Sequence, residues 1–277
     1  MKYLKLFFLI VIIGGFFIFI YYKQKNVFKK NVYLNPKWKY ADYSVIHSGA
    51  AVLYSSSFSK KNIVVALNAG HGTIGGEEKK TYCHPDKTPK VTGGSTAINS
   101  IQASAISKGT TFLDGTSEAD VNLMVAKLLK EKLLDAGYDV LMIRDGDDVQ
   151  LDNVARTVIS NNIADIHVSI HFDDSANDNG AFYISVPEHV TYRNMEPVSS
   201  YWKEHERLGS GLISGLKKAK VKVSDNISLP IDLTQTSFST IPSVDIELGD
   251  KKSDISKTAL KNYANGLFLG ISQYFQE

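Results

Sequence analysis

The feature that most constrains the fold is an alternation of strand-like and helix-like runs, which begins near residue 61. The strand-like runs are short and apolar, whereas the helix-like runs carry apolar residues at i, i+3, i+4 and i+7 spacing. The expected strands are 63–67, 139–144, 165–171, 181–186 and 243–248, and the expected helices are 119–136, 151–162, 201–219 and 255–275. This alternation is typical of a single α/β domain whose mostly parallel sheet is flanked by helices.

Two segments do not follow the alternation. Residues 23–60 are rich in Lys, Tyr, Ser and Asn, and we interpret them as a tether with one short strand at 49–54. Residues 72–117 are rich in Gly, Thr and Ser and show no periodicity. Because a loop of this length inside a compact domain is usually functional or mobile, we treat 72–117 as an insertion in a domain that spans 61–277.

The N-terminus carries an uncharged apolar run from Leu6 to Tyr22, which as a helix would be about 25 Å long, at the short edge of a bilayer span. Lys2 and Lys5 precede the run, and no small-residue cleavage pattern follows it. We therefore predict that residues 1–22 are an uncleaved signal-anchor. This transmembrane helix would leave the chain membrane-anchored, with its domain on the extracytoplasmic side.

Composition narrows the chemistry further. The 277-residue chain has 31 basic and 29 acidic residues, and a net charge of +2 is too small an asymmetry to indicate nucleic-acid binding. The single cysteine, Cys83, excludes an intrachain disulfide and any zinc site built from cysteine pairs. We interpret its neighbour His84 as part of an ordinary loop rather than of a second metal site. A metal site must therefore be assembled from His, Asp and Glu.

Polar residues stand where three expected strands end. His71 follows the first strand in "NAGHG", His171 ends the third in "SIHFD", and Glu247 lies near the end of the last in "VDIELGD". Glu118 opens the first long helix, directly after the expected N-cap Ser117. Since ligands bind at the carboxyl ends of strands in open α/β sheets, we expect these side chains to form one site.

Two imidazoles and one carboxylate are a sufficient ligand set for catalytic zinc, which keeps a fourth position for water. A further carboxylate is then needed to move the proton of that water, and Glu247 is the candidate. Each of these residues also has an ordinary explanation. A histidine can be satisfied structurally, a glutamate can favour the positive end of a helix dipole, and a strand-end glutamate can simply meet solvent.

Four sequence blocks resemble a known family: "IVVALNAGHG", "EADVNLMVAKLLKEKLLDAGYDVLMIRDGDDVQLDNVART", "ADIHVSIHFD" and "PSVDIELGD", in this order. Together they are similar to the zinc-dependent N-acetylmuramoyl-L-alanine amidases of the amidase_3 type, over roughly residues 61–277. The resemblance implies a sheet of about six strands. It implies hydrolysis of the amide bond between N-acetylmuramic acid and L-alanine in peptidoglycan. It also implies that His71, Glu118 and His171 bind Zn²⁺ and that Glu247 is catalytic.

Two other functions are weighed against this one. The first is a relative that binds peptidoglycan or a wall protein without cleaving anything, and the second is a zinc peptidase on the same fold. All four chemical positions are filled in this chain, which favours the amidase. The sequence identifies neither the kind of peptidoglycan that is cut nor a protein activator.

The ligand assignment has rivals within the insertion. Glu77 and Glu78 lie closer to His71 along the chain than Glu118 does. We prefer Glu118 because "EADVNL" carries the local pattern of the family and a helix fixes its direction. The insertion 72–117 is expected to act as a lid or to read the substrate, because it starts directly after His71.

Three carboxylates depart from the family pattern. Asp173, Asp245 and Asp250 stand where the related amidases tend to carry Asn, an apolar residue and an aromatic residue. Asp245 and Glu247 share a strand face, so if they lie close together the two carboxyls would be coupled and one pKa would rise.

Two further residues are expected to be structural. Arg156, in the 151–162 helix, is expected to form an ion pair with Asp145 or Asp148. His167 lies about 13 Å from His171 along the same expected strand, which is too far for both to bind one metal ion.

Overall fold

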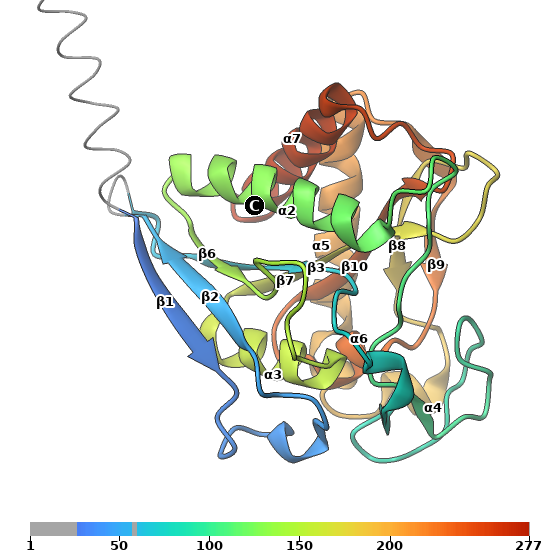
Figure 1. Cartoon of the computed structure of the whole chain (residues 1–277). Helices are drawn as coiled ribbons and strands as arrows, with labels where there is room; N and C mark the ends of the chain where they lie inside the picture. The colour runs from blue at the N-terminus through green and yellow to red at the C-terminus, as the bar shows by residue number, and fades with distance from the viewer. Residues whose placement is uncertain (1–26, 57–59, 277) are drawn as a thin grey trace, which may run out of the picture.

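The centre of the protein is an eight-stranded sheet, seen in a computed structural model that describes residues 27–56 and 60–276 (Figure 1). The four central strands run parallel, and antiparallel pairs join them to the outer strands on both sides. In spatial order the strands are β1 (Phe28–Tyr33), β2 (Ala50–Ser55), β6 (Asp139–Met142), β3 (Val64–Ala69), β7 (Ile166–Asp173), β10 (Ser243–Asp250), β8 (Ala181–Ser185) and β9 (Val223–Pro230).

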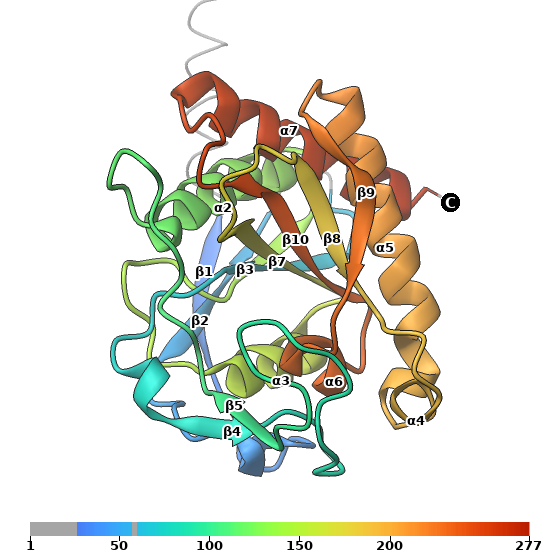
Figure 2. The ribbon, with the colours of Figure 1, turned by 90° about the vertical axis from the view of Figure 1, so that its right-hand side faces the viewer.

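Helices cover both faces of this sheet. Figure 2 shows α2 (Glu118–Asp135), α5 (Val198–Lys218) and α7 (Lys257–Tyr274) on one face, and α3 (Asn153–Ile163) and α6 (Thr234–Phe238) on the other. The short helix α4 (Val190–Arg193) precedes α5. The first face holds the main hydrophobic core, to which the central strands contribute alternate residues such as Val65, Val168 and Val244. The expected α/β layering is therefore confirmed.

Side-chain caps mark where the long helices begin. The hydroxyl of Ser117 accepts a hydrogen bond from the Asp120 N–H at 3.2 Å, so α2 starts at Glu118. Asp152 caps α3 through the Ala155 N–H at 2.8 Å. These caps satisfy backbone donors that have no partner inside the helix, and they fix the residue at which each helix turns toward the sheet.

The expected number of strands, about six, is wrong, because the sheet has eight. Two of them, β1 and β2, lie within the 23–60 segment that we interpreted as a tether, although a strand at 49–54 was expected there. The strand β9 was not expected at all. Its sequence and that of β1 are polar because each is an edge strand, and edge strands carry charged or polar residues that discourage pairing with other chains.

The predicted signal-anchor, residues 1–22, lies outside the described residues. Across 27–56 and 60–276, no helix combines the length and the apolar character that a bilayer span requires.

The insertion has structure of its own, and one of the groups that fasten it to the domain is a buried carboxylate. It contains the 3-10 helix η2 (Gly76–Glu78) and a small two-stranded sheet, β4 (Lys80–Tyr82) with β5 (Gln102–Ser104). Asp232, just before α6, accepts hydrogen bonds from His84 Nε2 at 3.0 Å and from Lys90 Nζ at 2.7 Å. It also accepts one from the hydroxyl of Thr92. All of the Asp232 carboxylate is buried, so these donors replace its lost hydration.

Removing the charge of Asp232 is expected to destabilise the fold. In Asp232→Asn the ammonium of Lys90 stays buried without its counter-charge, which costs about 3 kcal/mol of unfolding free energy. Urea unfolding measures this cost, and Asp225→Asn, an exposed change on β9, serves as the control. A loss of the same size in both variants would contradict the role given to Asp232.

The same carboxylate predicts a pH dependence. Burial opposes ionisation, but hydrogen bonds from His84, Lys90 and Thr92 outweigh it and hold the pKa of Asp232 below its usual range. A lowered folded-state pKa stabilises the protein above the unfolded-state pKa of about 3.9. This contribution is lost as the pH falls through the folded-state pKa, so the stabilities of Asp232→Asn and the parent chain should converge in acid.

Candidate active site

The candidate site lies at the carboxyl ends of β3, β7 and β10, on the face that also carries α3. Side chains alternate between the two faces of a strand, so Ser169 and His171 of β7 point away from the main core, as do Asp245 and Glu247 of β10. The parallel register pairs Ser169 with Asp245 and His171 with Glu247. A row of polar side chains therefore runs along two neighbouring strands toward the edge of the sheet.

His71 stands on a left-handed turn directly after β3. Its φ is 65°, and that of the following Gly72 is 68°. For a residue with a side chain, this conformation is strained and needs support from its surroundings. Arg156, wholly buried, donates to the carbonyl of His71 at 2.7 Å, and Arg144 donates to the carbonyl of Gly70 at 3.0 Å. These bonds hold the turn so that the His71 ring lies over the sheet edge.

Three candidate ligands meet at one point. His71 Nε2 lies 2.9 Å from Glu118 Oε1, and His171 Nδ1 lies 3.1 Å from the same oxygen. The two ring nitrogens are 3.0 Å apart. Among the described residues this is the group of His, Cys, Asp and Glu whose ligand atoms could hold a metal ion. The structure thus brings together the three residues that the sequence indicated, from β3, α2 and β7.

Groups behind each ligand orient it toward the others. The Ser107 carbonyl lies 2.9 Å from His71 Nδ1, so Nδ1 carries the proton and the Nε2 lone pair faces the cluster. The Thr110 N–H donates to Glu118 Oε2 at 2.9 Å, and Asn122 Nδ2 donates to Glu118 Oε1 at 3.1 Å. Such outer contacts fix the tautomer of a histidine ligand and the direction of a carboxylate.

The donor set fits a divalent metal ion. With its proton on Nε2, His171 also directs a lone pair into the cluster, where it meets the lone pairs of His71 and the Glu118 carboxylate. Three such lone pairs within about 3 Å repel one another unless a cation lies among them. Ligands around tetrahedral zinc are separated by roughly 3.4 Å, and His₂Glu is a set that catalytic zinc sites use.

Without metal, a proton supplies the missing positive charge. Burial would lower the pKa of His171, but Asp245, Glu118 and Glu247 outweigh it and raise that pKa to about 10. Burial would raise the pKa of Glu118, yet His171 and His71 together hold it well below its usual range. A metal ion bound at this cluster would displace a proton from His171, so its affinity would fall as the pH falls.

Glu247 lies beside the cluster with a free oxygen. Burial, followed by the charge of Asp245, raises the pKa of Glu247 well above its usual range, as expected for two neighbouring carboxyls. Glu247 Oε2 and Asp245 Oδ1 are buried and have no hydrogen-bond partner in the described part of the chain. The unpartnered oxygen of Glu247, next to the three candidate ligands, makes this residue a candidate for acting on a bound molecule.

The structure also gives the positions of the other residues that were considered for the site. The exposed residues Glu77 and Glu78 lie in η2, outside the cluster. His167 is fully buried outside the cluster, both of its ring nitrogens lack a hydrogen-bond partner among the described residues, and burial lowers its pKa to about 3. The buried Asp250 accepts from the Asp178 N–H at 2.6 Å and orders the loop after β7.

The predicted ion pair of Arg156 with Asp145 or Asp148 is wrong. Arg156 points under the β3 turn and donates to oxygens that include the carbonyl of His71 and Asn68 Oδ1. Asp145 instead accepts from the Tyr54 hydroxyl at 2.5 Å, and Asp148 accepts from a backbone N–H at 3.0 Å.

Sequence reasoning did not identify the residues that support the ligands. Asn122 had a usable signal, because a residue four positions after Glu118 in a helix lies on the same face. Arg144 closed an expected strand, and its guanidinium joins the β3 turn to the Ala119 carbonyl of α2 at 2.6 Å. Ser107 and Thr110 lie in the insertion and had no signal. The expected role of the insertion as a lid or substrate-reading element stays a prediction.

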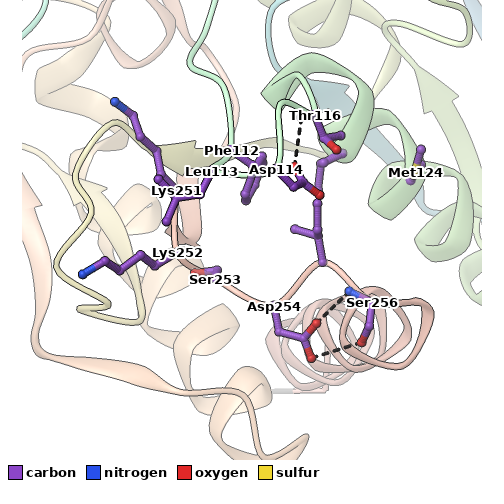
Figure 3. Close-up of a pocket in the computed structure, with 12 residues that line it drawn as sticks. Phe112, Leu113, Asp114, Thr116, Met124, Lys251, Lys252, Ser253, Asp254 and Ser256 are labelled. Atoms are coloured by element: carbon purple, nitrogen blue, oxygen red, sulfur yellow. Dashed lines mark hydrogen bonds between the residues drawn. The ribbon is translucent and has the colours of Figure 1, made fainter.

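A pocket of about 580 Å³ lies at the N-terminal end of α2 (Figure 3). It lies between the segment that follows Thr110, the first turns of α2 and residues 251–256. None of the four candidate site residues lines it. Asp174 connects its two walls, because it accepts from the Thr110 hydroxyl and pairs with Lys251 Nζ, each at 2.5 Å. Its rim carries exposed apolar side chains, Leu113 and Met124.

A His-Glu-His cluster at the carboxyl edge of an α/β sheet, beside an unpartnered carboxyl, is an arrangement suited to metal-assisted hydrolysis. The family model of N-acetylmuramoyl-L-alanine amidases, Amidase_3, matches residues 65–268. The chain belongs to this family. It is an N-acetylmuramoyl-L-alanine amidase, which hydrolyses the bond between N-acetylmuramic acid and L-alanine in peptidoglycan.

Solved amidase structures have the same fold. The amidase Ami1 from Mycobacterium smegmatis superposes with a TM-score of 0.59 at 17% identity, over 78% of this chain and 97% of that one. Ami1 from Mycobacterium abscessus gives 0.57 at 21%, over 77% and 99%. The CwlD amidase from Clostridioides difficile, solved in complex with the GerS lipoprotein, gives 0.54 at 20%, over 78% and 99%. No curated protein matches the chain.

A methyl group at Gly109 is expected to weaken metal binding. Gly109 has a φ of +86°, and a Cβ there would lie 2.6 Å from His71 Cδ2 and 3.0 Å from Glu118 Oε2. Gly109→Ala should therefore displace two ligands and lower the affinity for a divalent ion about tenfold or more, measured by competition with a chelator.

Gly115→Ala is the matched control for this change. Gly115 has a φ of +88°, and a Cβ there would have no atom within 4 Å, so the variant carries the same backbone strain of about 1 kcal/mol without the clash. An equal loss of metal affinity in both variants would show that backbone strain, and not ligand displacement, is responsible.

Proposed function

We propose that this amidase depends on zinc and that Glu247 moves the proton in the reaction. One observation supports the proposal. His71, Glu118 and His171 form a cluster, and His171 is paired across β7 and β10 with Glu247, which has an unpartnered oxygen. Histidine and carboxylate donors suit zinc, and three protein ligands leave a position for water or substrate.

The chemistry divides between the ligands and Glu247. His71, Glu118 and His171 would hold the ion, which when bound supplies a Lewis acid that polarises the amide carbonyl and makes water more acidic. Glu247 takes a proton from the attacking water while the oxygen of that water adds to the lactyl carbonyl carbon. When the C–N bond breaks, Glu247 gives that proton to the leaving nitrogen, so that a carboxylic acid and the free amine of L-alanine are formed.

The position of Glu247, which is partly buried and has one fully buried oxygen, supports this role. A carboxyl whose pKa is raised can keep a proton between the two steps at neutral pH, whereas an exposed carboxyl would release it. A protein that only binds peptidoglycan would have no use for a buried carboxyl without a partner. The third interpretation, a zinc peptidase, differs in the bond that it cuts and is distinguished by the products.

Replacing Glu247 is expected to separate metal binding from hydrolysis. Glu247→Gln keeps the size of the side chain but cannot accept the proton, so the rate should fall by roughly 10²–10⁴-fold while the zinc content stays unchanged. Mass spectrometry of peptidoglycan digests measures the free stem peptide. The exposed change Asp225→Asn should leave activity unchanged, and wild-type cleavage by Glu247→Gln would remove Glu247 from the mechanism.

Zinc content tests the ligand assignment. The protein purified from zinc-containing medium should carry about one ion per chain, as expected for a single three-ligand site. Glu118→Ala should lose the ion because it removes the carboxylate between the two rings, whereas Glu77→Ala should keep it. Elemental analysis after dialysis gives the answer, and the reverse pattern would move the ligand role into the insertion.

We also propose that residues 1–22 anchor the enzyme in the membrane, with its domain on the cell-wall side. The support is the uncharged run from Leu6 to Tyr22, together with a substrate that lies outside the cytoplasmic membrane. Fractionation of cells and protease treatment of spheroplasts would locate the domain.

A further inference from the structure

Asp245 lies next to the ligand cluster, within β10. Its neighbours Val244 and Ile246 face the main hydrophobic core, whereas Asp245 points to the polar face, opposite Ser169 of β7. The residue is only 9% exposed. Asp245 is two residues before Glu247 on the same face of β10, farther from the carboxyl end of the strand.

The carboxylate has one charged partner within residues 27–56 and 60–276. Asp245 Oδ2 lies 3.6 Å from His171 Nε2, and Asp245 Oδ1 has no hydrogen-bond partner there. The distance is within the range of an ion pair and a few tenths of an ångström beyond that of a hydrogen bond. A small rotation of either side chain would form a direct Nε2–H···O bond.

Packing does not account for this residue. A buried carboxylate costs free energy unless it is paired, and an apolar side chain of similar size would fill the same space at no such cost. One oxygen of Asp245 remains unpartnered, so the carboxylate is poorly suited to stabilising the fold. The function of Asp245 must be sought in its contact with His171.

That contact acts on the nitrogen of His171 that does not face the cluster. The other nitrogen, Nδ1, lies 3.0 Å from His71 Nε2 and 3.1 Å from Glu118 Oε1. A neutral imidazole can give its Nδ1 lone pair to a metal ion only when the proton is on Nε2, and a carboxylate at Nε2 favours this tautomer and fixes the ring. The Ser107 carbonyl acts in the same way on His71.

We infer that Asp245 is a positioning residue, which holds the ring of His171 so that Nδ1 points at the metal ion and thereby raises the affinity of the site for metal. The inference rests on the proposed metal centre but does not depend on hydrolysis. The two histidines would then be supported from behind by different groups, a carbonyl for His71 and a carboxylate for His171.

Metal affinity gives the first test. Asp245→Asn keeps the volume and removes the charge, and Asp245→Leu removes the polar group. Zn²⁺ titration of the full chain against a chelator should show an affinity about 10–100-fold weaker in both variants. Asp173→Asn is the matched control, since it removes a carboxylate charge from the end of β7 that has no ion pair with His171, and it should change the affinity far less. Parent-like affinity in both Asp245 variants would overturn the inference.

The tautomer of His171 gives the second test. In zinc-loaded, ¹⁵N-histidine-labelled protein, the Nε2–H proton of His171 should resonate downfield and exchange slowly with water, in the parent chain and in Asp173→Asn. In Asp245→Leu the same proton should move upfield because it has lost its acceptor. An unchanged resonance would assign Asp245 a merely structural role, which would appear instead as a lower urea midpoint of the metal-free chain.

The outcomes separate this inference from the proposed function. A parent chain that binds no zinc would defeat the metal centre itself. A parent chain that binds zinc tightly, together with Asp245 variants that bind equally tightly, would defeat only the role of Asp245. If Asp245→Leu fails to fold, Asp245→Asn, which has nearly the same shape, still decides between these results.

Discussion

The geometry of the site depends on two buried guanidinium groups, those of Arg144 and Arg156. His71 has a left-handed backbone conformation, which costs of order 1–3 kcal/mol and persists only where the surroundings fix it. Arg156 binds the carbonyl of His71, and Arg144 binds the carbonyls of Ala69 and Gly70. Arg144 also donates to a carbonyl in the first turn of α2, so the same side chain binds the backbone next to His71 and the backbone next to Glu118. The distance between these two candidate ligands therefore depends on hydrogen bonds to the main chain. A lysine in place of Arg144 could not make these bonds, because its ammonium group lacks the planar set of donors of a guanidinium group.

The same strands build the hydrophobic core and the site. Along β7 and β10, one face is apolar and packs against α2, α5 and α7, while the other face carries the polar row that ends at His171 and Glu247. Because side chains alternate with a period of two, a slip of one residue would turn the histidines of β7, or the carboxylates Asp245 and Glu247 of β10, into the core. The cost of such a slip fixes the register, and the register places His171 beside Glu247. Core formation thus determines the position of the proposed catalytic group without any contribution from substrate or metal.

The periodic elements and the meeting of four polar residues could be predicted because each depends on local pattern or on strand direction. Apolar periodicity located the nine expected elements, and strand-end reasoning, together with the family resemblance, brought His71, Glu118, His171 and Glu247 to one edge. The edge strands β1 and β9 were not predicted, because edge strands are polar and lack the alternation of a half-buried strand. Arg156 was misassigned for a different reason. Its partners are mainly backbone carbonyls, which every residue has, so no sequence pattern distinguishes them from a carboxylate.

The insertion is best understood through its two attachments. Near its middle, Asp232 binds His84 and Lys90 and fixes the chain to the body of the domain. Near its end, Ser107 and Thr110 bind His71 and Glu118, so the insertion contributes directly to the orientation of the candidate ligands. Between these attachments, residues 93–99 are mostly exposed. A change at Ser107 or Thr110 would therefore act directly on the candidate ligands, whereas a change at Asp232 would act on the way the insertion is held to the domain.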